Sequence, residues 1–233
     1  MSIIDWYYVH SARYDILHKI LLHFIDKTKF NPVPLFVEQE VFDKDLYKHK
    51  DKHFFTGISI KIEKIIEIIE GRCSSNLEAP FLFTDCDIIV TKYASFTLPS
   101  YAQRNEIDIY FQRETLTTTT VNPGCMIIHP NERTLYFFKT VLDDIKKNNK
   151  MEMDSINELL HRPDNKVKFF YFNTSDVCSS ITKTHSTFSI YYILSNCVSK
   201  EFDMQSKYLE IKMLNEMHGF YGSHFILDAK VSE

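Results

Sequence analysis

The sequence predicts an α/β fold in which helices cover a mainly parallel sheet. Segments with strand and helix patterns alternate along the chain, which is the order expected of such a sheet. The segment Pro80–Val90 is a strongly apolar strand that only two aspartates interrupt. The 233 residues, 44% of them hydrophobic, are enough for one large domain with its own core.

Two strands and two helices come first along the chain. Their order is strand Ile3–His10, helix Tyr14–Ile25, strand Pro34–Val41 and helix Ser59–Glu70. Each helix carries apolar residues at helical spacing, and isoleucines line one face of the second. Gly71 follows that helix directly and is expected to end it.

The later elements follow the apolar strand. The alternating segment Glu106–Gln112 and the segment Gly124–His129 predict two more strands. Asn131 is a good N-cap for a helix that carries Leu135, Phe138, Leu142 and Ile145. A short helix over Met153–Leu160 and a strand over Lys168–Phe172 complete the pattern, which is weak after Asn173.

Composition and missing motifs exclude several functional classes. The net charge is −4 and no basic block stands out, so we expect no nucleic-acid partner. The five cysteines form no CxxC pair, which favours a reducing compartment. We find no signal peptide and no apolar run of the roughly 20 residues that a membrane span needs, and we therefore expect a cytoplasmic protein. The first strand-to-helix loop lacks the glycine-rich motifs of dinucleotide and P-loop sites.

One pair of aspartates stands in an unusual setting. Asp85-Cys86-Asp87 lies between apolar runs, whereas Asp43-Lys44-Asp45 has polar neighbours and is interpreted as a solvated loop. Two carboxylates held close together in apolar surroundings need compensation, which a divalent cation supplies. Oxygen ligands favour Mg²⁺ or Mn²⁺. The alternative is that the pair lies past the strand end, solvated or capping a helix.

Several segments resemble motifs of the GT-A fold glycosyltransferases, in the nucleotide-diphospho-sugar transferase group. The resemblance spans roughly residues 55 to 160 and rests on the order and spacing of its parts, which are Lys61, the DxD strand 82–88, and the segments 106–112, 121–128 and 154–157. It implies a single GT-A domain, Rossmann-like, with a nucleotide-sugar-binding half over 1–130 and an acceptor-side half over 131–233.

The resemblance assigns the donor-binding residues. Asp85 would contact the ribose or a Mn²⁺ or Mg²⁺ ion, Asp87 would be the firmer metal ligand, and His218 would be a third. Lys61 would neutralise the diphosphate. The first loop, with Ser11 and with Tyr14 available for stacking, would bind the nucleobase.

The same resemblance assigns the sugar side of the site. Gln112 and Asn122 would hydrogen-bond the transferred sugar, and Gly124 belongs to the same donor-binding segment. Asp154 would contact sugar or acceptor hydroxyls, or act as a base if the enzyme inverts. The chain departs from the family pattern because Pro123 replaces a small residue, Ser155 stands where glutamine is usual and Asn157 comes one residue early.

The resemblance therefore implies a metal-dependent enzyme that moves a sugar from a nucleotide-diphosphate sugar, a UDP-sugar for preference, to a glycan or protein hydroxyl with retention. The chain is rich in Ile, Lys, Asn, Phe and Tyr and poor in Gly, which is typical of AT-rich genomes. This composition and the missing signal also fit a viral enzyme that acts in a host cytoplasm. Two alternatives stay open. One is a haloacid-dehalogenase-type phosphatase. Such enzymes have an acidic pair late in their sequence, which Asp143-Asp144 could imitate. The other is a non-catalytic nucleotide-sugar-binding module.

Overall fold

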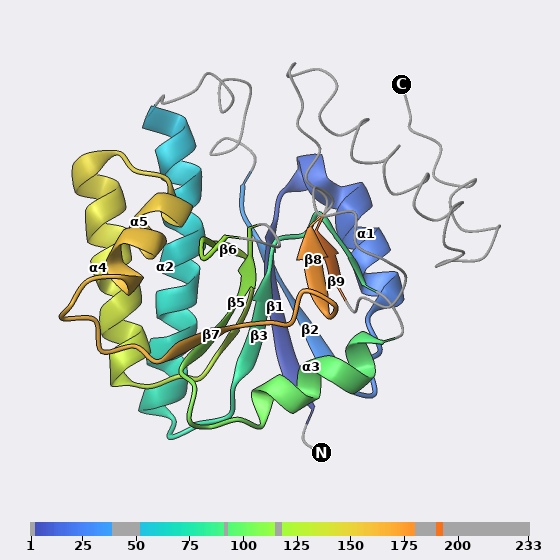
Figure 1. The fold of residues 1–233 in the computed structure, drawn as a ribbon. Helices are drawn as coiled ribbons and strands as arrows, with labels where there is room; N and C mark the ends of the chain where they lie inside the picture. The colour runs from blue at the N-terminus through green and yellow to red at the C-terminus, as the bar shows by residue number, and fades with distance from the viewer. Residues whose placement is uncertain (1–2, 39–51, 91–92, 115–117, 180–189, 193–233) are drawn as a thin grey trace.

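A computed structural model describes residues 3–38, 52–90, 93–114, 118–179 and 190–192 (Figure 1). Its helices are the 3₁₀ helix η1 (Ala12–Tyr14), α1 (Asp15–Phe24), α2 (Lys52–Ser74), α3 (Ala94–Ala102), α4 (Glu132–Asn148) and α5 (Glu152–Leu160). Its strands are β1 (Ile4–His10), β2 (Phe30–Phe36), β3 (Phe81–Thr84), β4 (Ile88–Val90), β5 (Ile109–Arg113), β6 (Val121–Ile128), β7 (Phe169–Tyr171), β8 (Val177–Ser179) and β9 (Ile190–Tyr192).

Six strands form the central sheet in the order β2-β1-β3-β6-β5-β7. Strand β6 runs antiparallel to both of its neighbours, and the other pairings are parallel. This confirms the prediction of a mixed, mainly parallel sheet. The strands β4, β9 and β8 form a second, smaller sheet.

Helices cover both faces of the central sheet (Figure 1). On one face α2, α4 and α5 bury an apolar layer that includes Ile62, Ile69 and Phe138. On the other face α1 and α3 pack on a second layer that includes Trp6 and Tyr110. The isoleucine face predicted for the helix around residue 60 is thus confirmed.

Strand β2 starts earlier than the sequence pattern indicated. The prediction of Pro34–Val41 is wrong at its start, because β2 begins at Phe30, and residues 39–41 lie outside the described residues. Pro32 and Pro34 have no N–H to donate, and the edge position of β2 in the sheet tolerates both.

Helix α2 does not end at Gly71, as the sequence suggested, but continues to Ser74. A Cβ added at Gly71 would meet nothing within 4 Å, so packing does not require glycine there. The left-handed residue that closes the helix is Asn76, with φ 52°. The N–H of Leu77 then donates to the carbonyl of Arg72 at 2.9 Å, which is the bonding of a Schellman end.

The apolar segment predicted as one strand over Pro80–Val90 is two strands in different sheets. Strand β3 belongs to the central sheet and β4 to the smaller one, and the chain changes sheet at Asp85-Cys86-Asp87. Helix α3, which contains Pro99 and lacks apolar periodicity, escaped prediction altogether.

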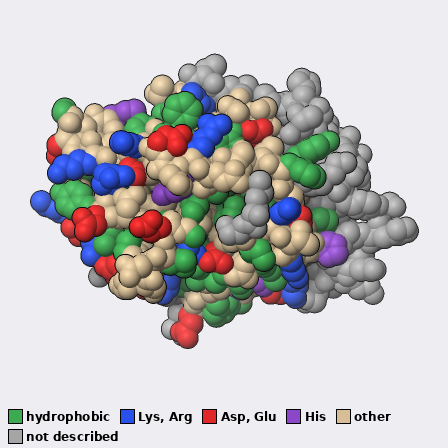
Figure 2. Space-filling model, turned by 90° about the horizontal axis from the view of Figure 1, so that it is seen from below, with side chains coloured by type: hydrophobic (Ala, Val, Ile, Leu, Met, Phe, Trp, Pro, Cys, Tyr) green, Lys and Arg blue, Asp and Glu red, His purple; other side chains and the backbone are tan. Residues whose placement is uncertain are grey.

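The lower end of the molecule in Figure 1, from which β1 starts, carries both positive and negative side chains. In the view from below, acidic and basic side chains are interspersed over the residues that Figure 2 colours. Within the described ranges, no helix is long and apolar enough to cross a membrane.

Candidate functional site

The aspartate pair, Asp85 and Asp87, lies in the turn that follows β3, near the middle of the central sheet. Asp87 is buried and Asp85 is half-buried. The main-chain N–H of Asp85 donates to the carbonyl of Gly124 on β6 at 2.9 Å. The carboxyl ends of parallel strands are where open α/β sheets bind ligands.

Lys61 on α2 reaches the aspartate pair from the helical layer. Its Nζ lies 2.6 Å from Oδ1 of Asp85 and 3.7 Å from Oε1 of Glu152. Burial alone would lower the pKa of Lys61, but the carboxylates of Asp85, Glu152 and Asp87 outweigh burial and raise it. Lys61 therefore carries a positive charge in a buried place.

Glu152, the first residue of α5, is a site residue that the sequence analysis missed. Its Oε2 is buried and has no hydrogen-bond partner among the described residues. Burial raises the pKa of Glu152, Lys61 opposes this rise, and Asp85 adds to it. A buried carboxylate oxygen without a partner is costly, and it is expected to receive a donor or a cation from outside the described residues.

The charged cluster of Lys61, Asp85, Asp87 and Glu152 sets three carboxylates against one ammonium group. When all four are ionised, carboxylates outnumber the ammonium group within this cluster, and a divalent cation suits such a group. Within the described ranges, no group of three or more His, Cys, Asp or Glu residues is arranged to hold a metal ion. The aspartate pair would thus need water, phosphate or further ligands, and the predicted ligand His218 lies outside the described residues.

Gln112 lies at the end of β5, fully buried. Neither its amide oxygen nor its amide nitrogen has a hydrogen-bond partner among the described residues. An unpartnered buried amide is rare in folded proteins, so this one is expected to bind water or a polar ligand. The sugar-binding role that the resemblance implied for Gln112 stays a prediction.

Asn122 lies opposite Gln112, but its amide is already engaged. Its Oδ1 accepts from the N–H of Gly124 at 2.7 Å, and its Nδ2 donates to Oε2 of Glu114 at 2.5 Å. A direct bond from Asn122 to a sugar would have to use the remaining amide hydrogen or lone pair.

Pro123 and Gly124 form part of an irregularity in β6. Phe111 pairs with Met126 and Gln112 pairs with Asn122, so residues 123–125, here named the β6 bulge, face no residue of β5. The missing N–H of Pro123 therefore breaks no bond of the β5–β6 ladder, which explains in physical terms how this departure from the family pattern is tolerated.

The two departures in α5 also have structural explanations. Ser155 is buried, and its Oγ donates to Oδ2 of Asp144 on α4 at 2.7 Å. Asn157 accepts from the N–H of Val121 at 2.8 Å and donates to the carbonyl of Val121 at 3.0 Å. Asn157 thus ties α5 to the start of β6.

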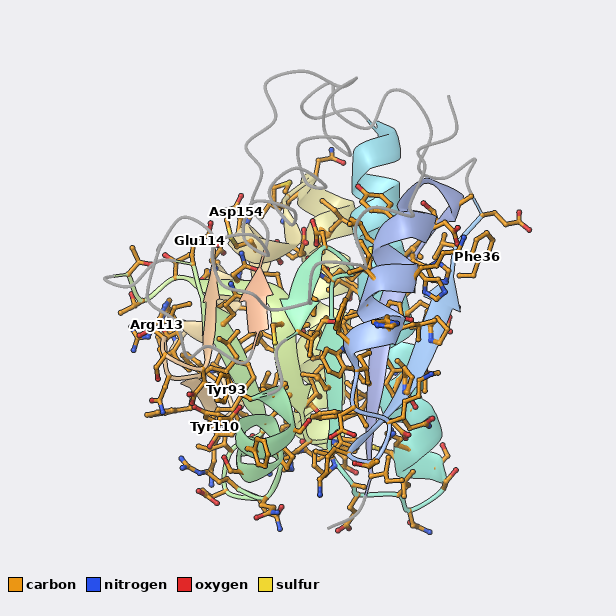
Figure 3. The ribbon with its side chains drawn as sticks, turned by 90° about the vertical axis from the view of Figure 1, so that its right-hand side faces the viewer. Phe36, Tyr93, Tyr110, Arg113, Glu114 and Asp154 are labelled. Carbon is orange, nitrogen blue, oxygen red and sulfur yellow. The ribbon has the colours of Figure 1, made fainter. Side chains whose placement is uncertain are left out.

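Asp154 is exposed on α5. Figure 3 shows Asp154 and Glu114 near the upper end of the molecule, toward which β1 runs, while Tyr93 and Tyr110 lie near the lower end. An exposed carboxylate at this end is placed to meet a molecule that approaches from solvent.

The first loop begins with two unpartnered polar groups. Ser11 is 1% exposed, and neither its Oγ nor Nδ1 of His10 has a hydrogen-bond partner among the described residues. Tyr14, half-buried at the end of η1, packs against the apolar layer under α1. Packing there does not favour a free stacking role for this tyrosine.

The acidic pair that a phosphatase would need lies elsewhere. Asp143 and Asp144 are in α4, and Asp144 accepts from Ser155 and also from Nδ2 of Asn148 at 2.6 Å. The carboxylate of Asp144 therefore joins α4 to α5 by the hydrogen bond from Ser155.

Comparison with protein families gives one match. A model of the nucleotide-diphospho-sugar transferases matches residues 75–208, which is more than half of the chain. No curated protein matches the sequence.

Solved glycosyltransferases share the fold at low sequence identity. A glycosyltransferase involved in glycosylation of the major capsid of PBCV-1 has a TM-score of 0.58 and 12% identity, over 91% of this chain and 100% of that one. The galactosyltransferase LgtC, solved with donor and acceptor sugar analogs, has a TM-score of 0.57 and 10% identity, over 94% and 97% of the two chains. The bifunctional glycosyltransferase WbbM has a TM-score of 0.55 and 8% identity, over 84% and 46%. The shared fold is GT-A-like.

Proposed function

The chain belongs to the nucleotide-diphospho-sugar transferase family, and we propose that it moves a sugar from a UDP-sugar to a hydroxyl group of a glycan or protein, with the help of Mn²⁺ or Mg²⁺. The observation that carries this proposal is the charged cluster at the carboxyl end of β3. Its grouped carboxylates around one lysine, and a Glu152 oxygen that has no hydrogen-bond partner among the described residues, suit a cation and a polar donor.

Asp85 and Asp87 would hold the metal, with His218 as a further ligand. When bound, the ion would neutralise charge on the diphosphate leaving group. Lys61 would also neutralise negative charge on that diphosphate. Its Nζ lies beside Asp85 and near Glu152, so its positive charge is already placed in the site. Ser11 of the first loop stays the proposed contact to the nucleobase.

The sugar would lie between β5, β6 and α5. Gln112 offers an amide that has no partner among the described residues, and Glu152 offers a carboxylate oxygen. Asn122 would hydrogen-bond the sugar, and Gly124, whose N–H donates to Asn122, would belong to the same segment. Asp154, exposed on α5, is the proposed contact to the acceptor hydroxyl. Retention is part of the proposal because the resemblance of segments 121–128 and 154–157 is to motifs found mostly in retaining enzymes.

The test is release of nucleoside diphosphate from a panel of UDP- and GDP-sugars, with MnCl₂ or with EDTA. We expect one donor to be turned over with MnCl₂ only, and Asp87→Asn to lower the rate by at least about 100-fold, since metal-site changes act at this scale or above it. The exposed aspartate Asp143 is the matched control, and Asp143→Asn should leave the rate unchanged.

A different pattern would favour the rival enzyme. If no nucleotide-sugar is turned over, and p-nitrophenyl phosphate is hydrolysed by the wild type but not by Asp143→Asn, the transferase proposal is wrong. Binding of a donor without any release of nucleoside diphosphate would instead indicate a non-catalytic module.

A further inference from the structure

Glu114 directly follows β5, and the sequence analysis gave it no role. We propose that Glu114 is a positioning residue that acts through Asn122 and Gly124 to hold the main chain of Asp85. This inference rests on the proposed function, because Asp85 and Asp87 are the proposed metal and nucleotide ligands.

A continuous series of hydrogen bonds joins Glu114 to the aspartate pair. Nδ2 of Asn122 donates to Oε2 of Glu114 at 2.5 Å. Oδ1 of Asn122 accepts from the N–H of Gly124 at 2.7 Å. The carbonyl of Gly124 in turn accepts from the N–H of Asp85 at 2.9 Å. Each bond fixes the group that forms the next one.

The β6 bulge explains the need for this series. Residues 123–125 face no residue of β5, so the N–H of Gly124 has no ladder partner on that side. Asn122 supplies the missing acceptor from its own side chain, within the same strand. On the other side β6 stays in register with β3, where Thr84 lies opposite Cys125, and the bond to Asp85 continues that ladder past the end of β3.

The acceptor oxygen of Glu114 decides which way the Asn122 amide faces. An ionised carboxylate only accepts hydrogen bonds, so it selects the Nδ2 side of the amide. The Oδ1 side must then face Gly124, whose N–H only donates. A side chain without an acceptor at position 114 would leave the orientation to the Gly124 bond alone.

Contacts of the β5–β6 hairpin hold Glu114 in place. Its N–H donates to the carbonyl of Thr120 at 3.0 Å across the β5–β6 hairpin. The preceding residue, Arg113, lies over the ring of Tyr171 at 4.1 Å and donates to the carbonyl of Thr118 at 3.1 Å. Figure 3 shows Glu114 above Arg113. The hairpin thus presents the carboxylate to Asn122 from an anchored position.

The test is calorimetric titration of UDP, and of GDP in parallel, into protein that contains MnCl₂. Hydrogen bonds to charged groups are strong enough that Glu114→Ala should weaken binding about ten-fold. Glu114→Gln keeps an acceptor oxygen and should bind within about three-fold of the wild type. The control is Glu158→Ala. It removes an exposed carboxylate of α5, and the variant should bind UDP like the wild type.

The double variant distinguishes positioning from direct contact. If Glu114 acts through Asn122, Glu114→Ala in an Asn122→Ala background should cause no additional loss. Wild-type affinity in Glu114→Ala, or losses that multiply in the double variant, would overturn the inference. Circular dichroism checks folding, and Glu114→Met, which keeps the length of the side chain, replaces the alanine variant if that does not fold. If the wild type binds neither nucleotide with MnCl₂, the proposed function fails and this inference fails with it.

Discussion

At the scale of a single residue, Lys61 offsets part of the negative charge of the site. Its ammonium group is nearly buried against Asp85 and Glu152. Lys61→Met leaves buried carboxylates without their cation, so we expect the metal-free protein to lose about 3–5 kcal/mol of unfolding free energy. Urea unfolding in EDTA measures the change.

A neighbouring lysine on the same helix provides the control for this prediction. Lys64 pairs with Glu67 on the exposed side of α2, and Lys64→Met should cost less than about 1 kcal/mol. Adding Asp85→Asn to Lys61→Met should restore part of the lost stability. Equal stabilities of Lys61→Met and Lys64→Met would show that the charged cluster is not coupled as described.

The residues of the site differ in how visible they are in the sequence. Asp85 and Asp87 are recognisable because two charges interrupt an apolar run. Glu152 is not, because it precedes the predicted helix by one residue and its partner Lys61 is distant in the chain. Glu114 is equally hidden, since its role depends on a bulge that only the pairing of β5 with β6 reveals.

Strand β1 and helix α1 share a pair of stacked histidines. The rings of His10 and His18 are parallel at 4.0 Å, and the hydroxyl of Tyr8 lies 3.0 Å from Nδ1 of His18. Burial lowers the pKa of both histidines, and His18 lowers that of His10 further. Asp15 opposes both shifts, whereas Lys19 adds to the shift of His18.

The histidine pair predicts a loss of stability in mild acid. A histidine whose pKa is lowered by folding binds more protons when unfolded, so the unfolding free energy falls as the pH drops below about 6.5. Above that range the contribution is complete. The double variant His10→Gln, His18→Gln should show a smaller drop between pH 7 and pH 5 by chemical denaturation, whereas His161→Gln should not. An unchanged drop in the double variant would contradict this account.

Elements are predictable from the sequence to the extent that local chemistry sets them. The N-cap of α4 is confirmed, since Asn131 accepts from Arg133 and Thr134 in a capping box. The split of the apolar segment into β3 and β4 was not predictable, because apolar periodicity cannot say which sheet a residue joins. The end of α2 was missed for a similar reason, since buried Arg72 bonds to the carbonyl of Ala79 and to Asp5 beyond the predicted end.

The whole molecule brings together parts that are distant in sequence. Lys61 and the aspartate pair come from the predicted donor half, 1–130, while Glu152 comes from the predicted acceptor half, 131–233. The two halves therefore meet at the charged cluster, and their separate roles stay a prediction. The family match and the GT-A-like fold agree with the inference of a nucleotide-sugar glycosyltransferase.

Metal-dependent binding of a nucleotide-sugar by the aspartate pair is the central claim, and thermal unfolding tests it most directly. The wild type and Asp87→Ala are heated with each nucleotide-sugar of a panel, with and without MnCl₂. A donor at 100 times its Kd should raise the wild-type Tm by about 5–10 °C. The account predicts this rise for one nucleotide-sugar, with MnCl₂ only, and its loss in Asp87→Ala. An equal rise in both proteins, or no rise with any nucleotide-sugar, would contradict it.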